Sequence, residues 1–233
     1  RGGYRTFRWA KRFLKSASLP TMDCFIGNSS FYSAPEMRAL LTDDYRSEWD
    51  SSYTVRRHYE LLAKWPSADP VSAMTYLDTK LFLPSLNLAY SDKASMAASV
   101  EVRVPFVDHE VVASALNTPT RDRLRGFKQK HILRQIARRY LPSEIVHRPK
   151  APFGAPLRAW MRHDLRDLLE DSLSEETIRR RGYFKDKEIR RMIDWNNRGQ
   201  EDYAHRLWAL LTFELWHRMF IDDCDGHFTS TGN

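Results

Sequence analysis

A carboxylate and two hydroxyls recur at helical spacing near the middle of the chain. Asp92, Ser95 and Ser99 stand three and four residues apart, so a helix through them would present all three on one face. Such a face can line one wall of a polar cleft and contact a substrate through charge and hydrogen bonds. Glu101 and Arg103 follow directly and extend this run of candidate binding groups.

Pro105 interrupts the run, because it cannot continue a helix and it favours an extended conformation at Val104. Glu101, Arg103 and Asp108 therefore flank a turn. Two interpretations stay open for these charges: a network that pins the bend, or side chains that face a substrate. Asp108 is also placed to cap a helix that follows it.

Two cations stand close together further along the chain. Arg148 and Lys150 lie in the stretch 147–156, which holds three prolines and one glycine and is expected to be a shaped loop. A stiffened loop that presents two cations at fixed spacing can hold a polyanion such as a triphosphate or a leaving pyrophosphate. A solvated loop lysine is the alternative interpretation of Lys150.

Several other chemistries find no support in the sequence. It contains no GxxxxGK[ST] phosphate loop, no HExxH and no GxSxG. Cys24 and Cys224 lie near opposite ends without CxxC or Cys/His spacing, which argues against a disulfide framework and a zinc site. The eight histidines are scattered, so we name no metal ligand.

Apolar residues recur at three- and four-residue spacing through most of the chain, which predicts a mainly α fold. We expect helices over about 53–64, 69–82, 84–99, 129–140 and 202–220, and one that begins after Asp108. Pro84 is expected to be the first residue of its helix. Without a repeat or a long linker, residues 1–221 are expected to form one helical unit, and 222–233 a polar tail. Five residues of the last helix have core-facing spacing: Leu207, Trp208, Leu211, Leu215 and Trp216.

Composition limits the class of protein. The apolar content of 42% suffices for a core, and the net charge of +7 gives a surface that could attract nucleic acid, anionic membrane or phosphorylated small molecules. No apolar run reaches the length of a membrane span, and the basic N-terminus lacks the apolar stretch of a signal peptide. We expect a cytoplasmic location.

One stretch carries a specific resemblance. Residues 92–108 read DKASMAASVEVRVPFVD, which resembles the D-[RK]-x-S-M-x-x-x-x-E-x-R-x-P-F-[LV]-D signature of glutamine-hydrolysing asparagine synthetases and related amide ligases. Further matches keep the order of that family: Asp78 with Leu83-Pro84, KHILR at 130–134, Leu141-Pro142, and RPKAPF at 148–153. The resemblance is strong over about residues 76–160 and generic after about 165.

The resemblance implies a fold and a reaction. The fold is the helical C-terminal portion of an α/β pyrophosphate-loop ATPase-type (adenine nucleotide alpha hydrolase-like) synthetase domain. The reaction is the synthesis of asparagine from aspartate and glutamine-derived ammonia through an acyl-adenylate. In the family, the lysine at the position of Lys150 faces the nucleotide phosphates, so Lys150 is the catalytic candidate. The candidates for substrate or phosphate binding are Asp92, Ser95, Ser99, Glu101, Arg103 and Arg148; Asp78, Pro105 and Asp108 complete the structural motif.

The phosphate loop, the acidic metal ligands and the glutaminase domain of that family have no counterpart in this sequence. Residues 1–4, RGGY, resemble the end of the family's S-G-x-G-x-D-E segment. ATP and Mg²⁺ would therefore be bound mainly by an upstream portion or a partner subunit, and the isolated chain is expected to be inactive. A homodimer is a further expectation.

Three alternatives remain. A related ligase could act on another carboxylate, as in β-lactam formation or peptide cyclisation. A basic helical nucleic-acid-binding module fits the charge but shows no recognisable helix-turn-helix or aromatic stacking pattern. A catalytically dead scaffold would leave the environment of Lys150 without a purpose.

Overall fold

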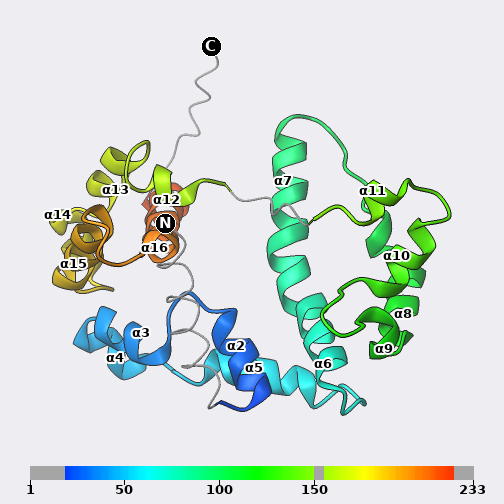
Figure 1. Cartoon of the computed structure of the whole chain (residues 1–233). Coiled ribbons are helices and arrows are strands. Elements are labelled where there is room, and N and C mark those ends of the chain that lie inside the picture. The colour runs from blue at the N-terminus through cyan, green and yellow to red at the C-terminus, as the bar shows by residue number, and fades with distance from the viewer. Residues whose placement is uncertain (1–18, 150–154, 223–233) are drawn as a thin grey trace. The chain divides into compact units, whose positions relative to one another are not determined.

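The computed structural model describes residues 19–149 and 155–222 (Figure 1). Within these ranges the backbone is helical and contains no named strand; two isolated bridges join Leu41 to Phe184 and Arg125 to Lys128. The prediction of a mainly α fold is confirmed. Among the same residues, no helix combines the length and the apolar character that crossing a membrane requires.

The described residues fall into two compact units. The first unit contains residues 19–26 and 52–149, and the second contains 27–51 and 155–222. The sequence predicted a single unit because no long linker interrupts it. Residues 27–51 belong to the second unit, and the composition of the sequence does not indicate this. The chain changes unit at Gly27 and Ser52 without a run of linker residues.

The first unit consists of short helices and one long helical column. Its elements are α2 (Thr21–Asn28, which runs two residues past the unit boundary), α5 (Tyr53–Leu62), α6 (Pro70–Leu77), the π-helix η1 (Asp78–Leu88), α7 (Ala89–Ala97), the 3₁₀ turn η2 (Pro105–Val107), α8 (His109–Asn117), α9 (Thr120–Arg123), α10 (His131–Ala137) and α11 (Ser143–Val146).

The column consists of α6, η1 and α7, which continue into one another without a break (Figure 1). The prediction that Pro84 begins a new helix is wrong, because Pro84 lies inside η1. A proline ring collides with the carbonyl four residues earlier in an α-helix and supplies no N–H. The wider turns of a π-helix can accommodate a proline inside the column. Short π segments are also frequent at functional sites.

A polar network fastens α9 to the start of α6. Asp69 caps α6 by accepting hydrogen bonds from the Ser72 backbone N–H at 2.9 Å and from the Ser72 hydroxyl at 2.6 Å. Thr120 of α9 also donates to Asp69, and the Arg123 guanidinium lies 3.8 Å from the same carboxylate. These hydrogen bonds, those from Ser72 and Thr120 first, lower the pKa of Asp69 to about 2.

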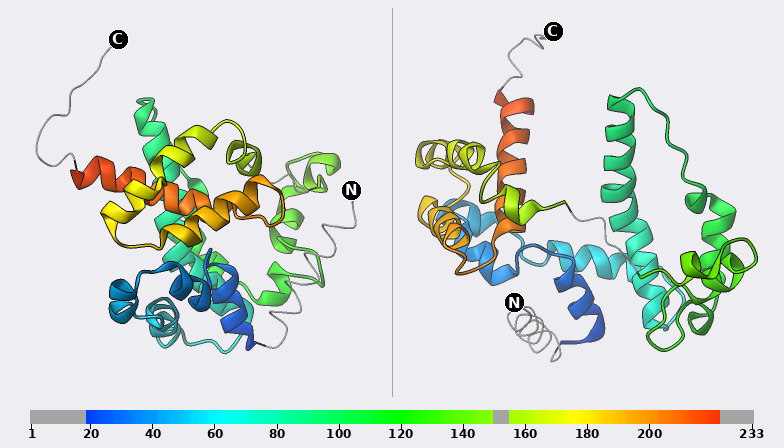
Figure 2. Two further views of the ribbon diagram at one scale, coloured as in Figure 1. Left: turned by 90° about the vertical axis from the view of Figure 1, so that its left-hand side faces the viewer. Right: turned by 45° about the horizontal axis from the view of Figure 1, so that its top comes forward.

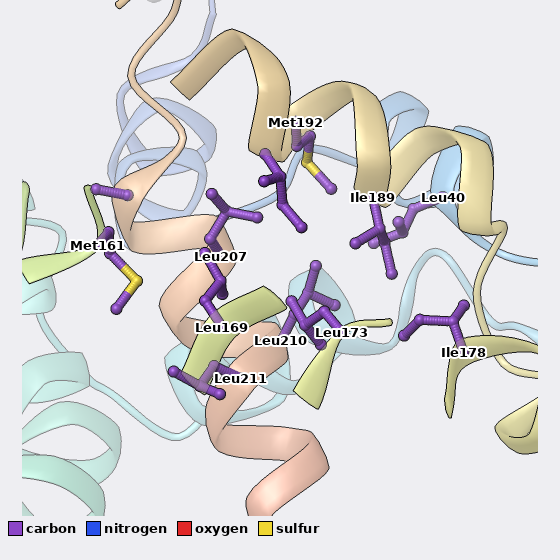
Figure 3. Close-up of a cluster of buried hydrophobic side chains, with 12 residues drawn as sticks. Leu40, Met161, Leu169, Leu173, Ile178, Ile189, Met192, Leu207, Leu210 and Leu211 are labelled. Carbon is purple, nitrogen blue, oxygen red and sulfur yellow. The ribbon is translucent and has the colours of Figure 1, made fainter. Parts of the chain in front are cut away.

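The second unit holds a cluster of buried apolar side chains (Figure 3). Its elements are α3 (Ala34–Leu40), α4 (Asp43–Glu48), α12 (Leu157–Trp160), α13 (Arg166–Ser172), α14 (Glu175–Arg181), α15 (Asp186–Asn197) and α16 (Ala204–Phe220). Leu207 and Leu211 of α16 meet Ile189 of α15 and Leu169 of α13, and all four are at most 1% exposed. Figure 2 shows α16 as a single straight helix.

The orientation of α16 differs from the prediction in two aromatic residues. Leu207 and Leu211 are buried as expected and Leu215 is partly buried against the cluster, but Trp208 and Trp216 are 38% and 47% exposed. Apolar residues surround this helix on every side, so their spacing alone does not fix the buried stripe. Glu214 and His217 occupy that stripe instead.

A buried arginine explains how Glu214 can lie inside. The Arg181 guanidinium binds both carboxylate oxygens of Glu214 at 2.9 Å, and their side chains are 8% and 3% exposed. Arg181 also donates to Asp222 at 2.7 and 2.5 Å. Burial acts to raise the pKa of Glu214, but the hydrogen bonds from Arg181 and Arg218 outweigh it and hold that pKa below its usual value. Asp222, the first residue of the expected polar tail, is thus tied to the fold; residues 223–233 lie outside the described ranges.

Candidate functional site

Asp92 and Ser95 lie on α7, the last part of the helical column. Their spacing of three residues places them on neighbouring positions of one helix face, as the sequence predicted. The Ser95 hydroxyl donates to the Asp92 backbone carbonyl at 3.0 Å, and the Asp92 side chain is exposed. The Asp92 carboxylate is therefore accessible to a ligand.

Ser99 does not share this face, because the helix ends before it. The backbone of Ser99 is left-handed, with φ of 55°. The Val100 N–H bonds to the Ser95 carbonyl and the Ser99 N–H to the Met96 carbonyl, both at 2.9 Å, which is the hydrogen-bond pattern of a Schellman ending. Glycine is the usual residue at the left-handed position of this motif, so the serine is held in a strained conformation.

The segment after Ser99 is open to solvent. Glu101 and Arg103 form an ion pair of 2.6 Å, but their side chains are 69% and 86% exposed. An exposed pair contributes little to stability, so Glu101 and Arg103 do little to hold the Pro105 bend, and a role toward a substrate stays a prediction. Pro105 instead begins η2, and Asp108 caps α8 by accepting from the backbone N–H groups of Glu110 at 2.9 Å and Val111 at 3.4 Å. The capping role of Asp108 is confirmed.

Apolar side chains alternate with the charges in this segment, and they are exposed as well. Val100, Val102 and Val104 are 43–54% exposed, and Phe106 is 70% exposed. Apolar side chains that are exposed next to one another are unusual on a protein surface. Such patches often mark a surface that another chain segment or a ligand covers.

The cationic loop is described only at its start. Arg148 follows α11 and its side chain is exposed, with its backbone N–H bonded to the Ile145 carbonyl at 3.4 Å. His147 beside it contacts the Arg138 guanidinium at 3.2 Å. Lys150, the catalytic candidate, lies outside the described residues, so the spacing of the two cations stays a prediction.

Two residues of the matched segments have features that the sequence did not signal. Lys130, the first residue of the KHILR segment, has a φ of 56°. Among the described residues, Lys130 and Ser99 are the two non-glycine residues with a positive φ. Asp78 lies at the first position of the π-helix, and burial raises the pKa of its carboxyl. Strained or desolvated residues concentrate at functional sites, and no residue type predicts either feature.

The described residues do not form a magnesium site by themselves. Within residues 19–149 and 155–222, no three His, Cys, Asp or Glu side chains gather as a metal would require. Arg148 is the described cation of the loop expected to face phosphate. Among the described candidate residues, Asp92 and Ser95 share α7 and the Glu101–Arg103 ion pair follows it, and that they form one wall of a site stays a prediction.

Relatives of known name cover most of this chain. It is 32% identical over 213 residues to the putative glutamine-hydrolyzing asparagine synthetase of Mycobacterium bovis, which covers 91% of the chain and 32% of the relative. It is 24% identical over 217 residues to asparagine synthetase 1 of Bacillus subtilis, covering 91% of the chain and 33% of that relative. The amidase chyE of Penicillium rubens is 28% identical over 134 residues, which are 54% of the chain and 19% of that protein.

The chain therefore spans about a third of the length of these synthetases. No solved structure matches it. The family description of asparagine synthase matches residues 2–218, which include every candidate residue named above. The chain belongs to the asparagine synthase family.

Proposed function

We propose that this chain supplies one side of the active site of an ATP-dependent ligase that converts a carboxylate and ammonia into an amide. Aspartate is the proposed acid and glutamine the source of the ammonia. The family match over residues 2–218 carries the proposal. The choice of substrates is supported by the two similar proteins that are named glutamine-hydrolyzing asparagine synthetases.

The chain's own residues would bind and orient substrates. ATP is a substrate here, and its part is to activate the carboxylate as an acyl-adenylate so that its oxygen can leave. Lys150 and Arg148 would stabilise the negative charge on the phosphates. The exposed Asp92 and Glu101 carboxylates, on and just after α7, are available for an amino group of the acid or for ammonia.

A second portion of the enzyme must complete this wall. The proposal places the phosphate loop and the Mg²⁺ ligands on that portion, either in the same polypeptide or on a partner subunit. Two observations support it: the chain spans about a third of the relatives' length, and Phe106 and Val100 stand exposed beside the candidate residues. Covering these side chains would remove apolar area from water and exclude water from the site.

Isotope transfer in the complete enzyme tests the reaction. Aspartate labelled with ¹⁸O in its side-chain carboxylate is incubated with ATP, Mg²⁺ and ammonia, and the products are analysed by mass spectrometry. We expect asparagine, pyrophosphate and AMP that carries one ¹⁸O, because adenylation transfers a carboxylate oxygen to the α-phosphate. Formation of ADP with ¹⁸O in inorganic phosphate would show a different class of ligase.

A second candidate is an amide ligase of the same family that acts on another acid. The similarity to the amidase chyE favours it, though over 54% of the chain against the 91% covered by the synthetases. Failure to form asparagine while another carboxylate yields its amide and AMP would favour this candidate.

A further inference from the structure

A groove unrelated to the candidate residues lies in the second unit, along α14 and α15. Its volume is about 460 Å³, which lies in the range of roughly 300–1,000 Å³ typical of small-molecule sites. Leu173 and Trp195 are the uncharged lining residues, and the others are charged. The groove is thus a polar site with the capacity for one small ligand.

Positive charge prevails in the lining once the ion pairs are counted. Arg179 pairs with Glu175 and also with Asp186, at 3.3 Å from the latter, so this group of three keeps one negative charge in excess. Arg191 pairs with Glu188 of its own helix at 2.7 Å.

Three further cations of the lining have no such partner. Among the residues that the structure describes, no carboxylate lies within 4.0 Å of the charged group of Lys187, Arg190 or Arg198. Asp194 likewise has no cation within 4.0 Å among these residues. Three free cations against one free carboxylate leave two positive charges, and the surplus carboxylate charge at Arg179 offsets one of them, so the groove keeps a net charge of one positive unit.

These free charges follow one face of α15. Lys187, Arg190, Asp194 and Arg198 are separated by three, four and four residues, so they form a stripe about 16 Å long at about 1.5 Å per residue. Lys187 and Arg190 are one turn apart, and a single anionic group between them can contact both. By contrast, Arg166 of the same unit is paired with Glu170 at 3.0 Å.

An aromatic surface adjoins the cations. Trp195 is 36% exposed in the groove wall, and the Arg191 guanidinium lies over its ring with 5.0 Å to the centroid. The arginine and the indole together offer planar groups on which the flat part of an organic ligand can stack.

We propose that this groove binds a small phosphorylated molecule that carries at least two negative charges. The three cations without an ion-pair partner can contact the oxygens of a phosphate monoester or a pyrophosphate, and the arginine fork matches phosphate geometry. A nucleic-acid strand fits less well, because Asp194 lies in the middle of the cationic stripe and would repel a continuous phosphate backbone. The proposal does not rest on the ligase reaction, since it uses none of the residues assigned to it.

Calorimetric titration of the 233-residue chain with pyrophosphate, in buffer without other phosphate, tests the proposal. We expect saturable one-site binding in the wild type and an affinity at least about tenfold lower in Lys187→Gln/Arg190→Gln, because each lost charged contact is worth a tenfold change or more. Arg57→Gln/Lys64→Gln is the matched control, since it removes the same charge from exposed positions in the first unit. The control is expected to bind as the wild type does.

Two additions keep the result decisive. Arg198→Gln, at the end of α15, serves if circular dichroism shows that the double variant is unfolded, and it too is expected to weaken binding. Titration with AMP, followed by tryptophan fluorescence, distinguishes the ligand classes. If AMP quenches the fluorescence of the wild type but not of Trp195→Phe, the ligand is a nucleotide. If pyrophosphate binds but AMP causes no such quenching, the ligand is a phosphate compound without a base.

Three results would overturn the proposal. The first is the absence of saturable pyrophosphate binding, and the second is an equal loss in the control variant, which would reveal attraction by net charge alone. The third is tighter binding of a single-stranded oligonucleotide than of pyrophosphate, with that binding lost in the groove variant, which would assign the groove to nucleic acid.

Discussion

Replacing Arg181 with methionine tests the buried charge network that fixes the end of α16. The change leaves Glu214 at 3% side-chain exposure without the two hydrogen bonds of 2.9 Å that Arg181 donates. Removing one partner of a buried ion pair costs about 3–5 kcal/mol. Arg218 still contacts Glu214 at 3.0 Å, so we place the expected loss at the lower end, about 3 kcal/mol.

Two further variants separate the contributions. Asp222→Asn removes a carboxylate that is 38% exposed, and its cost is expected to be much smaller than that of Arg181→Met, because an exposed ion pair contributes little to stability. In Arg181→Met/Glu214→Leu no buried charge is left without its partner, so most of the stability is expected to return, as apolar replacement of buried ion pairs often allows.

Urea unfolding followed by circular dichroism at pH 7 measures these differences. Arg166→Met is the surface control, because the Arg166–Glu170 pair of 3.0 Å is exposed. The loss in Arg181→Met should shrink as the pH falls toward 4, since protonation removes the buried negative charge that Arg181 no longer compensates. A loss in Arg181→Met no larger than in the control would refute the assignment of a stabilising buried network.

Three other predictions concern the first unit and the proposed site. Ser99→Gly is expected to raise the free energy of unfolding by about 0.5–1 kcal/mol, because glycine adopts the left-handed conformation without strain; a decrease on urea unfolding would contradict the strain argument. Asp69, whose folded pKa is about 2 against an ordinary value of 3.8, contributes stability that is present above about pH 4 and lost as the pH falls toward 2. The stability difference between wild type and Asp69→Asn should therefore narrow over that interval in urea titrations, and a constant difference would contradict it. The 233-residue chain is expected not to bind Mg-ATP with submicromolar affinity, and such tight binding in calorimetry would contradict the proposal that another portion supplies the phosphate loop.

The sequence predicted the helical class, the family and the cap of α8 by Asp108, because each can be inferred from local residue types and their spacing. It did not predict the passage of residues 27–51 into the second unit, the π winding at Pro84 or the burial of Glu214. These features depend on tertiary contacts: Glu214 is tolerated inside because Arg181, 33 residues earlier, lies against it.

The candidate site was predicted in part for the same reason. Asp92 and Ser95 lie together as their spacing requires, whereas Ser99 leaves the helix through a conformation that serine rarely adopts. The exposure of Glu101 and Arg103 also had no signal, since a charged pair beside a proline can be buried or open.

ATP–pyrophosphate exchange with aspartate in the complete enzyme tests most directly whether this chain contributes to the chemistry. Lys150→Ala should slow the exchange by roughly a hundredfold or more, as loss of a preorganised charge contact does, while the unfolding midpoint and any glutamine hydrolysis stay close to wild type. Lys150→Arg, which keeps the charge but changes its shape, should recover part of the exchange, and Lys64→Ala, at an exposed position after α5, should leave it unchanged. Exchange undiminished in Lys150→Ala would contradict the assignment of Lys150 to the phosphates of ATP.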